Sequence, residues 1–198
     1  IDSGTVVKDK QDREAYLLKQ NKDKSIGFID LEKVNETSDK EHYIICSYKD
    51  PDKLGETYQH KALKYFDLVA GIFATKIEQL FKNGYQNVYL VTDHGFVLTG
   101  ILDNSDKIEV DFKGNVKISE RFIRSENKQK IDTNLLIEKE VVYNNFNYSY
   151  FAKRLGPFKS TGVYGFSHGG LSPQETIIPF LKWSNDNNTQ DQVQVMIA

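Results

Sequence analysis

Residues 87–96, NVYLVTDHGF, hold the pattern that decides the fold of this 198-residue chain. The run from Asn87 to Val91 is almost wholly apolar, which predicts a strand buried on both faces of a sheet. Asp93 and His94 follow this strand, and carboxylate and imidazole groups are both good ligands for zinc. Gly95 gives the backbone freedom to turn both side chains toward one ion. A hydrogen-bonded polar pair is an equally good interpretation of Asp-His taken alone.

A long helix and another apolar strand precede this stretch. Apolar residues recur at three- and four-residue spacing between residues 60 and 83, which predicts an amphipathic helix that ends at Asn83-Gly84. The run Tyr43–Ser47 predicts a second doubly buried strand. Strand, helix and strand form a βαβ unit, so we predict a layered α/β fold around a mainly parallel central sheet. Ligands of such sheets bind beyond the carboxyl ends of the strands, here after Ser47 and Val91.

The remaining sequence predicts shorter elements, all within one domain that spans residues 1–198. Residues 1–40 are highly charged and carry little pattern beyond a short helix at 12–20 and a short strand at 25–29. Further along we predict a hairpin at 107–118 with its turn at 113–115, strands at 141–143, 164–167 and 176–183, a helix at 147–155, and a capped helix start at 172–175. Residues 184–198 predict a polar loop and an edge strand.

Composition excludes several classes of protein. Apolar residues make up 39% of the chain and the net charge is -2, so no global basic field draws it to nucleic acid or an anionic membrane. The single cysteine, Cys46, excludes a disulfide framework and favours a reducing, cytoplasmic location. No apolar stretch approaches the roughly 20 residues that span a bilayer, so we expect no membrane partner. The first residue is Ile1 rather than Met, and we interpret the chain as part of a longer polypeptide.

Two more polar clusters follow predicted strands. Residues 167–172, SHGGLS, place His168 before two glycines, although a turn histidine bonded to backbone is the better interpretation of this pattern taken alone. Residues 50–56, DPDKLGE, place Asp52 and Glu56 four residues apart, where both carboxylates can converge on a cation, and an ordinary acidic turn is the alternative. Three clusters of possible metal ligands thus follow three predicted strands, which is the arrangement expected of a metal site in an α/β fold.

These clusters resemble the motifs of a known family. Residues 91–96, VTDHGF, resemble the Asp-His-Gly-Phe signature of PglZ domains, and residues 168–179, HGGLSPQETIIP, resemble their C-terminal signature. The resemblance covers roughly residues 40–183. It implies the C-terminal, metal-ligand-bearing part of a PglZ domain in the alkaline phosphatase superfamily, with the N-terminal portion that carries the nucleophile missing.

The resemblance also implies a two-metal site, with zinc as the first expectation and manganese or magnesium as alternatives. Asp93 and His94 match the pair that binds the second metal, and His168 matches a ligand of the first. Asp52 and Glu56 match two further ligands of the first metal, with Glu56 where the superfamily usually has histidine. Asp50 and His60 are fallback ligands. We expect the Ser or Thr nucleophile and one further Asp upstream of Ile1, since Ser3 and Thr5 are candidates only by elimination.

The resemblance implies a metal-dependent phosphoester hydrolase that acts on a phosphomonoester or phosphodiester, with a nucleotide-derived compound as one candidate substrate. PglZ proteins are associated with bacterial phage defence, and similar domains occur in bacterial signalling proteins. Without its nucleophile this part of the domain is expected to be inactive. The candidates for binding substrate phosphate are Arg121, Arg124 and Arg154. The alternative is that these three side chains are ordinary solvent-exposed surface residues.

Two rival functions stay open, together with a role for aromatic side chains. A non-catalytic nucleotide- or protein-binding module that retains the fold is the first alternative, and Glu56 in place of histidine favours it. A different metal-dependent nuclease is the second, and it predicts no role for His168. Aromatics in residues 143–151 stack on bases if nucleic acid binds, but core packing is the stronger interpretation.

Overall fold

A computed structural model describes residues 7, 9–35, 41–100, 102–159, 165–185 and 194–195. The chain divides into two compact units. The first contains residues 1–49, 68–88 and 183–192, and the second contains residues 50–67, 89–182 and 193–198. Ser3 and Thr5, the nucleophile candidates by elimination, lie outside the described residues. The prediction of one domain over residues 1–198 stays a prediction.

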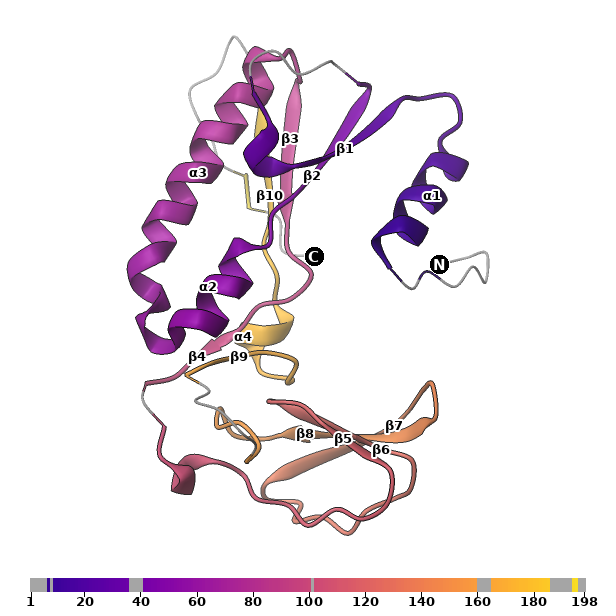
Figure 1. Cartoon of the computed structure of the whole chain (residues 1–198), viewed down its shortest axis with the longest axis vertical. Helices are drawn as coiled ribbons and strands as arrows, with labels where there is room; N and C mark the ends of the chain where they lie inside the picture. Colours follow the sequence, from indigo (N-terminus) through magenta and orange to yellow (C-terminus); the bar gives the residue numbers. More distant parts are fainter. Residues whose placement is uncertain are drawn as a thin grey trace. The chain divides into compact units, whose positions relative to one another are not determined.

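The first unit contains two parallel strands, a short helix near the start of the chain and most of a long helix (Figure 1). Its first elements are α1 (Lys10–Gln20), β1 (Ile26–Asp30), the short 3-10 helix η1 (Leu31–Lys33) and β2 (Tyr43–Ser47). Strands β1 and β2 pair in parallel from Ile26 opposite Tyr43 to Asp30 opposite Ser47. The helix α3 (Leu63–Lys82) extends into this unit and contributes Leu80 to a buried cluster. The predicted strand at 43–47 and the long helix are therefore confirmed.

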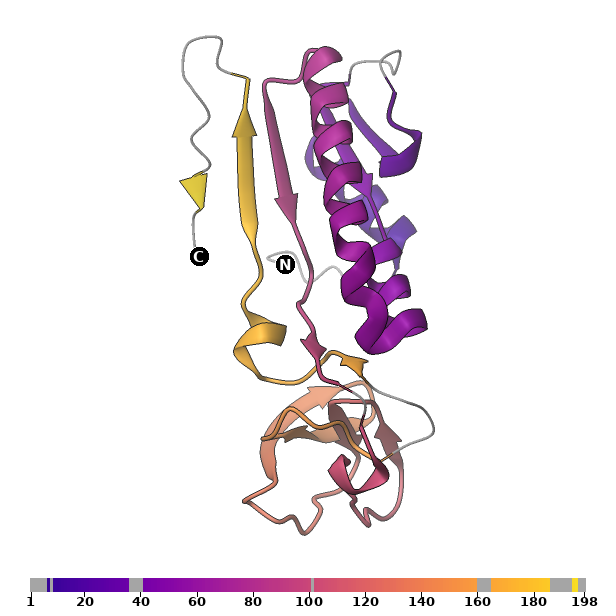
Figure 2. The same cartoon turned by 90° about the vertical axis from the view of Figure 1, so that its left-hand side faces the viewer.

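The mainly parallel central sheet is not what the described strands form. Strand β3 (Asn87–Val91) hydrogen-bonds to β10 (Phe180–Ser184), which also pairs with the edge strand β11 (Gln194–Val195). The arrows of β3 and β10 point in opposite directions in Figure 2. The predicted parallel neighbours β2 and β3 thus belong to separate small sheets, and β1–β2 is a parallel pair within a set of mostly antiparallel ones.

The two strands predicted to be buried on both faces are each packed on one face only, and none of their side chains is fully buried. Tyr43 and Ile45 in β2 are 49% and 40% exposed, and Tyr89 and Val91 in β3 are 53% and 61% exposed. The intervening Ile44, Cys46 and Val88 instead pack against the buried cluster of the first unit. Alternate side chains point to opposite faces of a strand, so a layer on one face covers only half of them.

The second unit carries the polar clusters. It begins with α2 (Asp50–Tyr58), the 3-10 helix η2 (Gln59–Ala62) and the first turn of α3, and continues through β4 (Val97–Leu98), the 3-10 helix η3 (Asn104–Asp106), β9 (Phe166–Ser167) and α4 (Pro173–Thr176). The chain between β4 and β9 forms a four-stranded antiparallel sheet with the strand order β5-β6-β8-β7. Its strands are β5 (Val116–Ile118), β6 (Phe122–Ser125), β7 (Leu136–Tyr143) and β8 (Phe146–Ala152).

Two predicted elements in this sheet are wrong. The helix expected at 147–155 is strand β8, whose alternating polar and aromatic residues pair with β6 on one side and β7 on the other. The hairpin expected at 107–118 has only its second strand, β5, and that strand pairs with β6. The buried residues Ile123, Leu136 and Tyr150 fill the core on one face of the sheet.

The capped helix start at 172–175 is confirmed by α4. Ser172 and Glu175 form a capping box in which each side chain accepts a hydrogen bond from the other residue's backbone amide. No helix in the described part of the chain is both long and apolar enough to cross a membrane.

Candidate metal centre

A short antiparallel pairing brings the two histidine motifs together. Strand β4, which follows the Asp93-His94 pair, pairs with β9, which precedes His168, so that Val97 lies opposite Ser167. The imidazole rings of His94 and His168 stack with their centroids 4.2 Å apart and their planes 9° apart. Residues distant in the chain thus bring two of the predicted metal-ligand side chains into direct contact.

Gly95 joins the first motif to α4 through close approach rather than through backbone freedom. Its amide donates a hydrogen bond to the Glu175 carbonyl oxygen, with a nitrogen–oxygen distance of 3.0 Å. A Cβ at this position would lie 2.1 Å from the carbonyl oxygen of Gln174. Gly95 is not among the residues with positive φ, so the predicted need for conformational freedom is wrong. Any side chain here would push the two motifs apart.

The acidic cluster at 50–56 forms a helix rather than a turn. Asp52 and Glu56 lie one helical turn apart on α2, so they share one face. An Asp52 carboxylate oxygen lies 3.6 Å from Nε2 of His94, and an Asp93 oxygen lies 3.8 Å from the same nitrogen. Nδ1 of His94 lies 3.1 Å from the Gly95 carbonyl oxygen. Asp52, Asp93 and His94 thus form one cluster with His168 stacked against it.

Contacts at Gly55 and Gln59 fix α2 against the strand that leads to His168. A Cβ on Gly55 would lie 2.3 Å from the Phe166 ring, so only glycine lets α2 approach β9 this closely. Gln59 accepts a hydrogen bond from the Phe166 amide at 2.9 Å and donates one to the Glu56 carbonyl oxygen at 2.7 Å. The glycine between Asp52 and Glu56 therefore has a packing function that positions both carboxylates.

Glu120 lies at the site although its sequence context gave no sign of it. It precedes β6, and its carboxylate accepts a hydrogen bond from the backbone amide of His168 and lies near Glu56. Burial is the main cause, and repulsion by Glu56 the second, of a rise in the pKa of Glu120 to about 7, against the lowering effect of the His168 amide. A short polar segment between two strands carries no local signal of such a contact.

Arg121 binds Glu175 in a buried ion pair. Both side chains are about 1% exposed, and Nε and Nη2 of Arg121 lie 2.9 and 3.1 Å from the two Glu175 oxygens. Nη1 of Arg121 donates to the carbonyl oxygens of Arg154 and Gly156 at 2.6 and 2.7 Å. These contacts argue against the predicted binding of substrate phosphate by Arg121. Its guanidinium is buried and already donates to acceptors within the protein.

The other predicted phosphate-binding and fallback residues lie in different surroundings. The Arg124 guanidinium lies 4.9 Å from the centroid of the Phe122 ring, and the Arg154 side chain is exposed. Asp50 begins α2 and His60 lies in η2. Within the described residues, neither Asp50 nor His60 forms an ion pair or hydrogen bond with His94 or His168.

The site has the donor groups of a metal centre without a closed set of ligands. Imidazoles and carboxylates are the nitrogen and oxygen donors that zinc accepts. Across the described ranges, no three His, Cys, Asp or Glu side chains converge closely enough to hold an ion. The chemistry of Asp52, Asp93, His94 and His168 therefore fits a divalent metal, and the two imidazole rings lie nearly parallel in contact.

Comparison with known proteins supports the motif assignment. The family model described as "BREX system PglZ alkaline phosphatase-like domain" matches residues 10–183. The chain is 27% identical over 114 residues to an alkaline phosphatase-like protein PglZ of Bacillus cereus strain H3081.97, a match that covers 55% of the chain and 13% of the relative. The chain thus spans only a small part of the length of this relative. No solved structure matches the chain.

Proposed function

Because the chain belongs to the family of BREX-system PglZ alkaline phosphatase-like domains, we propose that it is the metal-ligand-bearing part of a phosphoester hydrolase. The observation that carries the proposal is the contact between His94 and His168, with Asp52 3.6 Å from His94. Two imidazoles and a carboxylate from three separate segments meet there, and these are ligand groups that zinc accepts. Asp52 is about half exposed, so the cluster is accessible to ions and substrate.

The proposal assigns these residues to two cations. Asp93 and His94 would hold one, and His168, Asp52 and Glu56 would contribute to the other. The two imidazole rings are in contact, with their centroids 4.2 Å apart, so ions bound by them would be neighbours, as they are in two-metal hydrolytic sites. When bound, such ions lower the pKa of a nucleophile and neutralise charge on the phosphoryl oxygens.

The residues of this chain then have defined tasks in the proposal. His94 and His168 supply neutral nitrogen donors, and Asp52 and Asp93 supply negative charge that offsets the cations. The half-buried Glu120 carboxylate positions the backbone of His168 by accepting a hydrogen bond from the His168 amide. We propose that the nucleophile and a further Asp ligand lie upstream of Ile1, so the 198-residue chain by itself is expected to show little or no turnover.

A non-catalytic binding module is the second candidate, and two observations favour it. Glu56 stands where the superfamily usually has histidine, and the described ligands do not converge on a point. Zinc binding separates the two functions, because a module that has lost the chemistry has no reason to retain a stoichiometric, histidine-dependent ion.

The test is the zinc content of the whole chain after EDTA treatment, reloading with zinc and dialysis, measured by plasma mass spectrometry. We expect wild type to retain bound zinc and His168→Ala to lose about one equivalent. His42→Ala is the matched control, because His42 bonds to Ser25 in the first unit, and it should keep the wild-type content. Equal zinc content in all three proteins would refute the proposal.

A second variant probes the Glu56 position directly. Glu56→His restores the histidine that the superfamily usually has, so it should tighten zinc binding if this position faces the first ion. If the zinc affinity of Glu56→His is unchanged or weaker while its helical circular dichroism signal shows that it is folded, Glu56 is not one of the ligands.

A further inference from the structure

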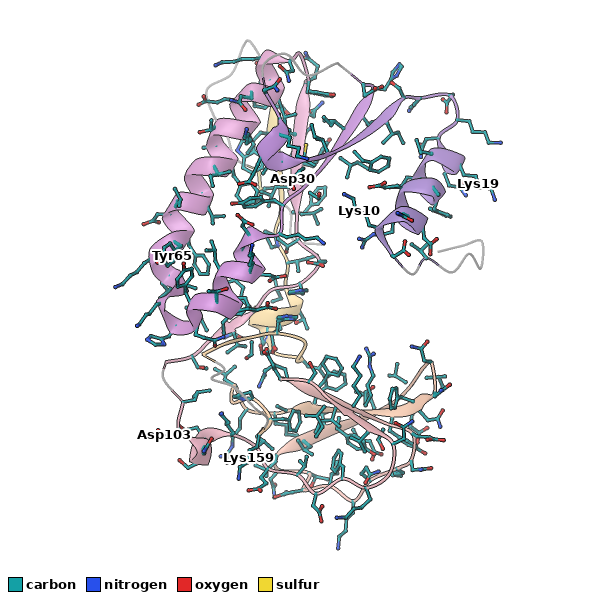
Figure 3. All side chains as sticks on the ribbon, in the orientation of Figure 1. Lys10, Lys19, Asp30, Tyr65, Asp103 and Lys159 are labelled. Carbon is teal, nitrogen blue, oxygen red and sulfur yellow. The ribbon has the colours of Figure 1, made fainter. Side chains whose placement is uncertain are left out.

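The four-stranded sheet of the second unit has one face that is not part of its core. Figure 3 shows side chains projecting from both faces of this sheet. Tyr150 and Tyr148 belong to the core face, which confirms core packing for these two aromatics. Residues directly opposite each other on paired strands share a face, so the printed register identifies what lies on the other one.

A row of basic residues crosses that face from one edge strand to the other. Lys117 lies opposite Arg124, Arg124 lies opposite Ser149, and Ser149 lies opposite Lys139. Ser149 is small and 4% exposed, so it leaves the two lysines and the arginine as the prominent groups. Within the described residues, the side chains of Lys117 and Lys139 make no hydrogen bond or ion pair. No carboxylate occupies a paired position on this face of the four strands.

A row of apolar side chains lies beside the basic row and leads to the candidate metal centre. Phe122 lies opposite Phe151, and Phe151 lies opposite Ile137. The two rings, both partly exposed, have centroids 6.4 Å apart. A Cβ on Gly169 would lie 2.9 Å from the Phe122 ring, so this ring borders the residue that follows His168.

The length of the basic row indicates the class of ligand that it can bind. Adjacent strands lie about 4.8 Å apart, so the row across four strands extends for about 14 Å. A single phosphate group cannot contact both ends, whereas successive phosphates of an extended strand can. Accessible aromatic rings beside cations bind single strands, through stacking of bases and attraction of the backbone, and Phe122 and Phe151 are partly exposed.

We propose that this face, defined by Lys117, Arg124, Lys139, Phe122 and Phe151, binds a single-stranded nucleic acid and leads it to the candidate metal centre. The proposal extends the proposed function by naming the class of phosphodiester, but strand binding itself requires neither metal nor hydrolysis. The net charge of -2 makes a local row of cations more informative than it would be on a basic protein.

The first experiment is fluorescence anisotropy of a labelled 15-nucleotide oligothymidine with the whole chain, in EDTA, at 50 and 200 mM KCl. Three phosphate contacts give a slope of about -2 in log K against log salt, hence roughly 20-fold weaker binding at the higher salt. Lys117→Gln/Lys139→Gln should reduce this change to roughly threefold and weaken binding at both salts. Lys128→Gln removes a lysine paired with Glu138 and should behave as wild type.

Two results with these variants would contradict binding of single-stranded nucleic acid at this face. Absence of salt-dependent binding by wild type, or an equal loss in the Lys128→Gln control, would overturn it. His168→Ala should retain oligothymidine binding in EDTA even where it loses zinc, so failure of the metal centre and failure of this surface are distinguishable.

A second measurement separates nucleic acid from other polyanions. Phe151→Leu, checked for folding by circular dichroism, should weaken oligothymidine at least fivefold through lost stacking while leaving inorganic polyphosphate binding unchanged. If polyphosphate binds wild type as tightly as oligothymidine does, the surface is a general anion-binding face and the proposed ligand is wrong.

Discussion

The carboxyl group of Glu120 couples the candidate metal centre to pH. Burial first, and Glu56 second, raise its pKa in the folded protein to about 7. An unfolded glutamate titrates near about 4.3. Between these values the folded state holds a proton that the unfolded state releases, so the contribution of Glu120 to stability falls as the pH rises through this window.

Glu120→Gln should therefore stabilise the metal-free protein at pH 8 and leave it nearly unchanged at pH 5. Glutamine stays neutral and retains an oxygen that can accept the His168 amide. Allowing for solvent around a half-buried group, we expect a gain on the order of 1–2 kcal/mol at pH 8. Urea unfolding in EDTA at both values measures it, and a gain that is the same at pH 5 and pH 8 would contradict the assigned cause.

The Arg121–Glu175 pair joins the start of β6 to α4. Burial by itself would raise the pKa of Glu175, but the Arg121 fork, the Ser172 hydroxyl and the Gly170 amide together bring it below its ordinary value. A lowered folded pKa means that the stabilisation is present above the unfolded value and is lost as the pH falls below about 4. The pair thus stabilises the segment that follows His168 at neutral pH.

Removing one partner should cost much more than removing a surface pair. Arg121→Ala leaves a buried carboxylate with only hydroxyl and amide donors, so we expect a loss of about 3–5 kcal/mol in urea unfolding at pH 7. Lys159→Ala, which breaks an exposed pair with Glu109, should cost at most about 1 kcal/mol. The Arg121→Ala deficit should shrink at pH 3.5, and a pH-independent deficit would argue against an ionised pair.

Local sequence signals predicted elements better than partners. The Ser172–Glu175 capping box was predictable because all its atoms lie within one turn of α4. Arg121 drew a substrate-binding prediction because its partner Glu175 lies far along the chain and no local pattern connects them. The error at β8 has the same origin, since its two strand partners override a short polar-aromatic run that also suits a helix.

At the scale of the whole molecule, the motifs predicted contacts that strand patterns did not. Asp93, His94 and His168 were expected together, and β4–β9 pairing brings the two histidines into contact. The parallel pairing of β2 with β3 followed only from chain order, and hydrogen bonds to β1 and β10 replace it. Strand pairing depends on residues far apart in the chain, so the pattern within one strand does not identify its partner. Gly95 lies in a recognisable motif, and the structure shows that it permits the close approach of α4.

Each compact unit contains its own buried cluster, and Cys46 reports on the first. Burial, with a smaller effect of Asp30, raises the pKa of the Cys46 thiol to about 11. At pH 8 its thiolate fraction is then roughly 200-fold below that of a free thiol, so disulfide reagents should label it mainly after opening.

Labelling of Cys46 therefore tests whether the two units open independently. Leu80→Ala removes a side chain from the cluster that Cys46 contacts and should cost about 2–5 kcal/mol, which accelerates labelling at least thirtyfold. Ile123→Ala removes a fully buried side chain from the other cluster and should change the rate less than threefold, even though it lowers the stability of the second unit. Comparable acceleration by both variants, measured by thiol reactivity at pH 8, would show that the units unfold together as one cooperative structure.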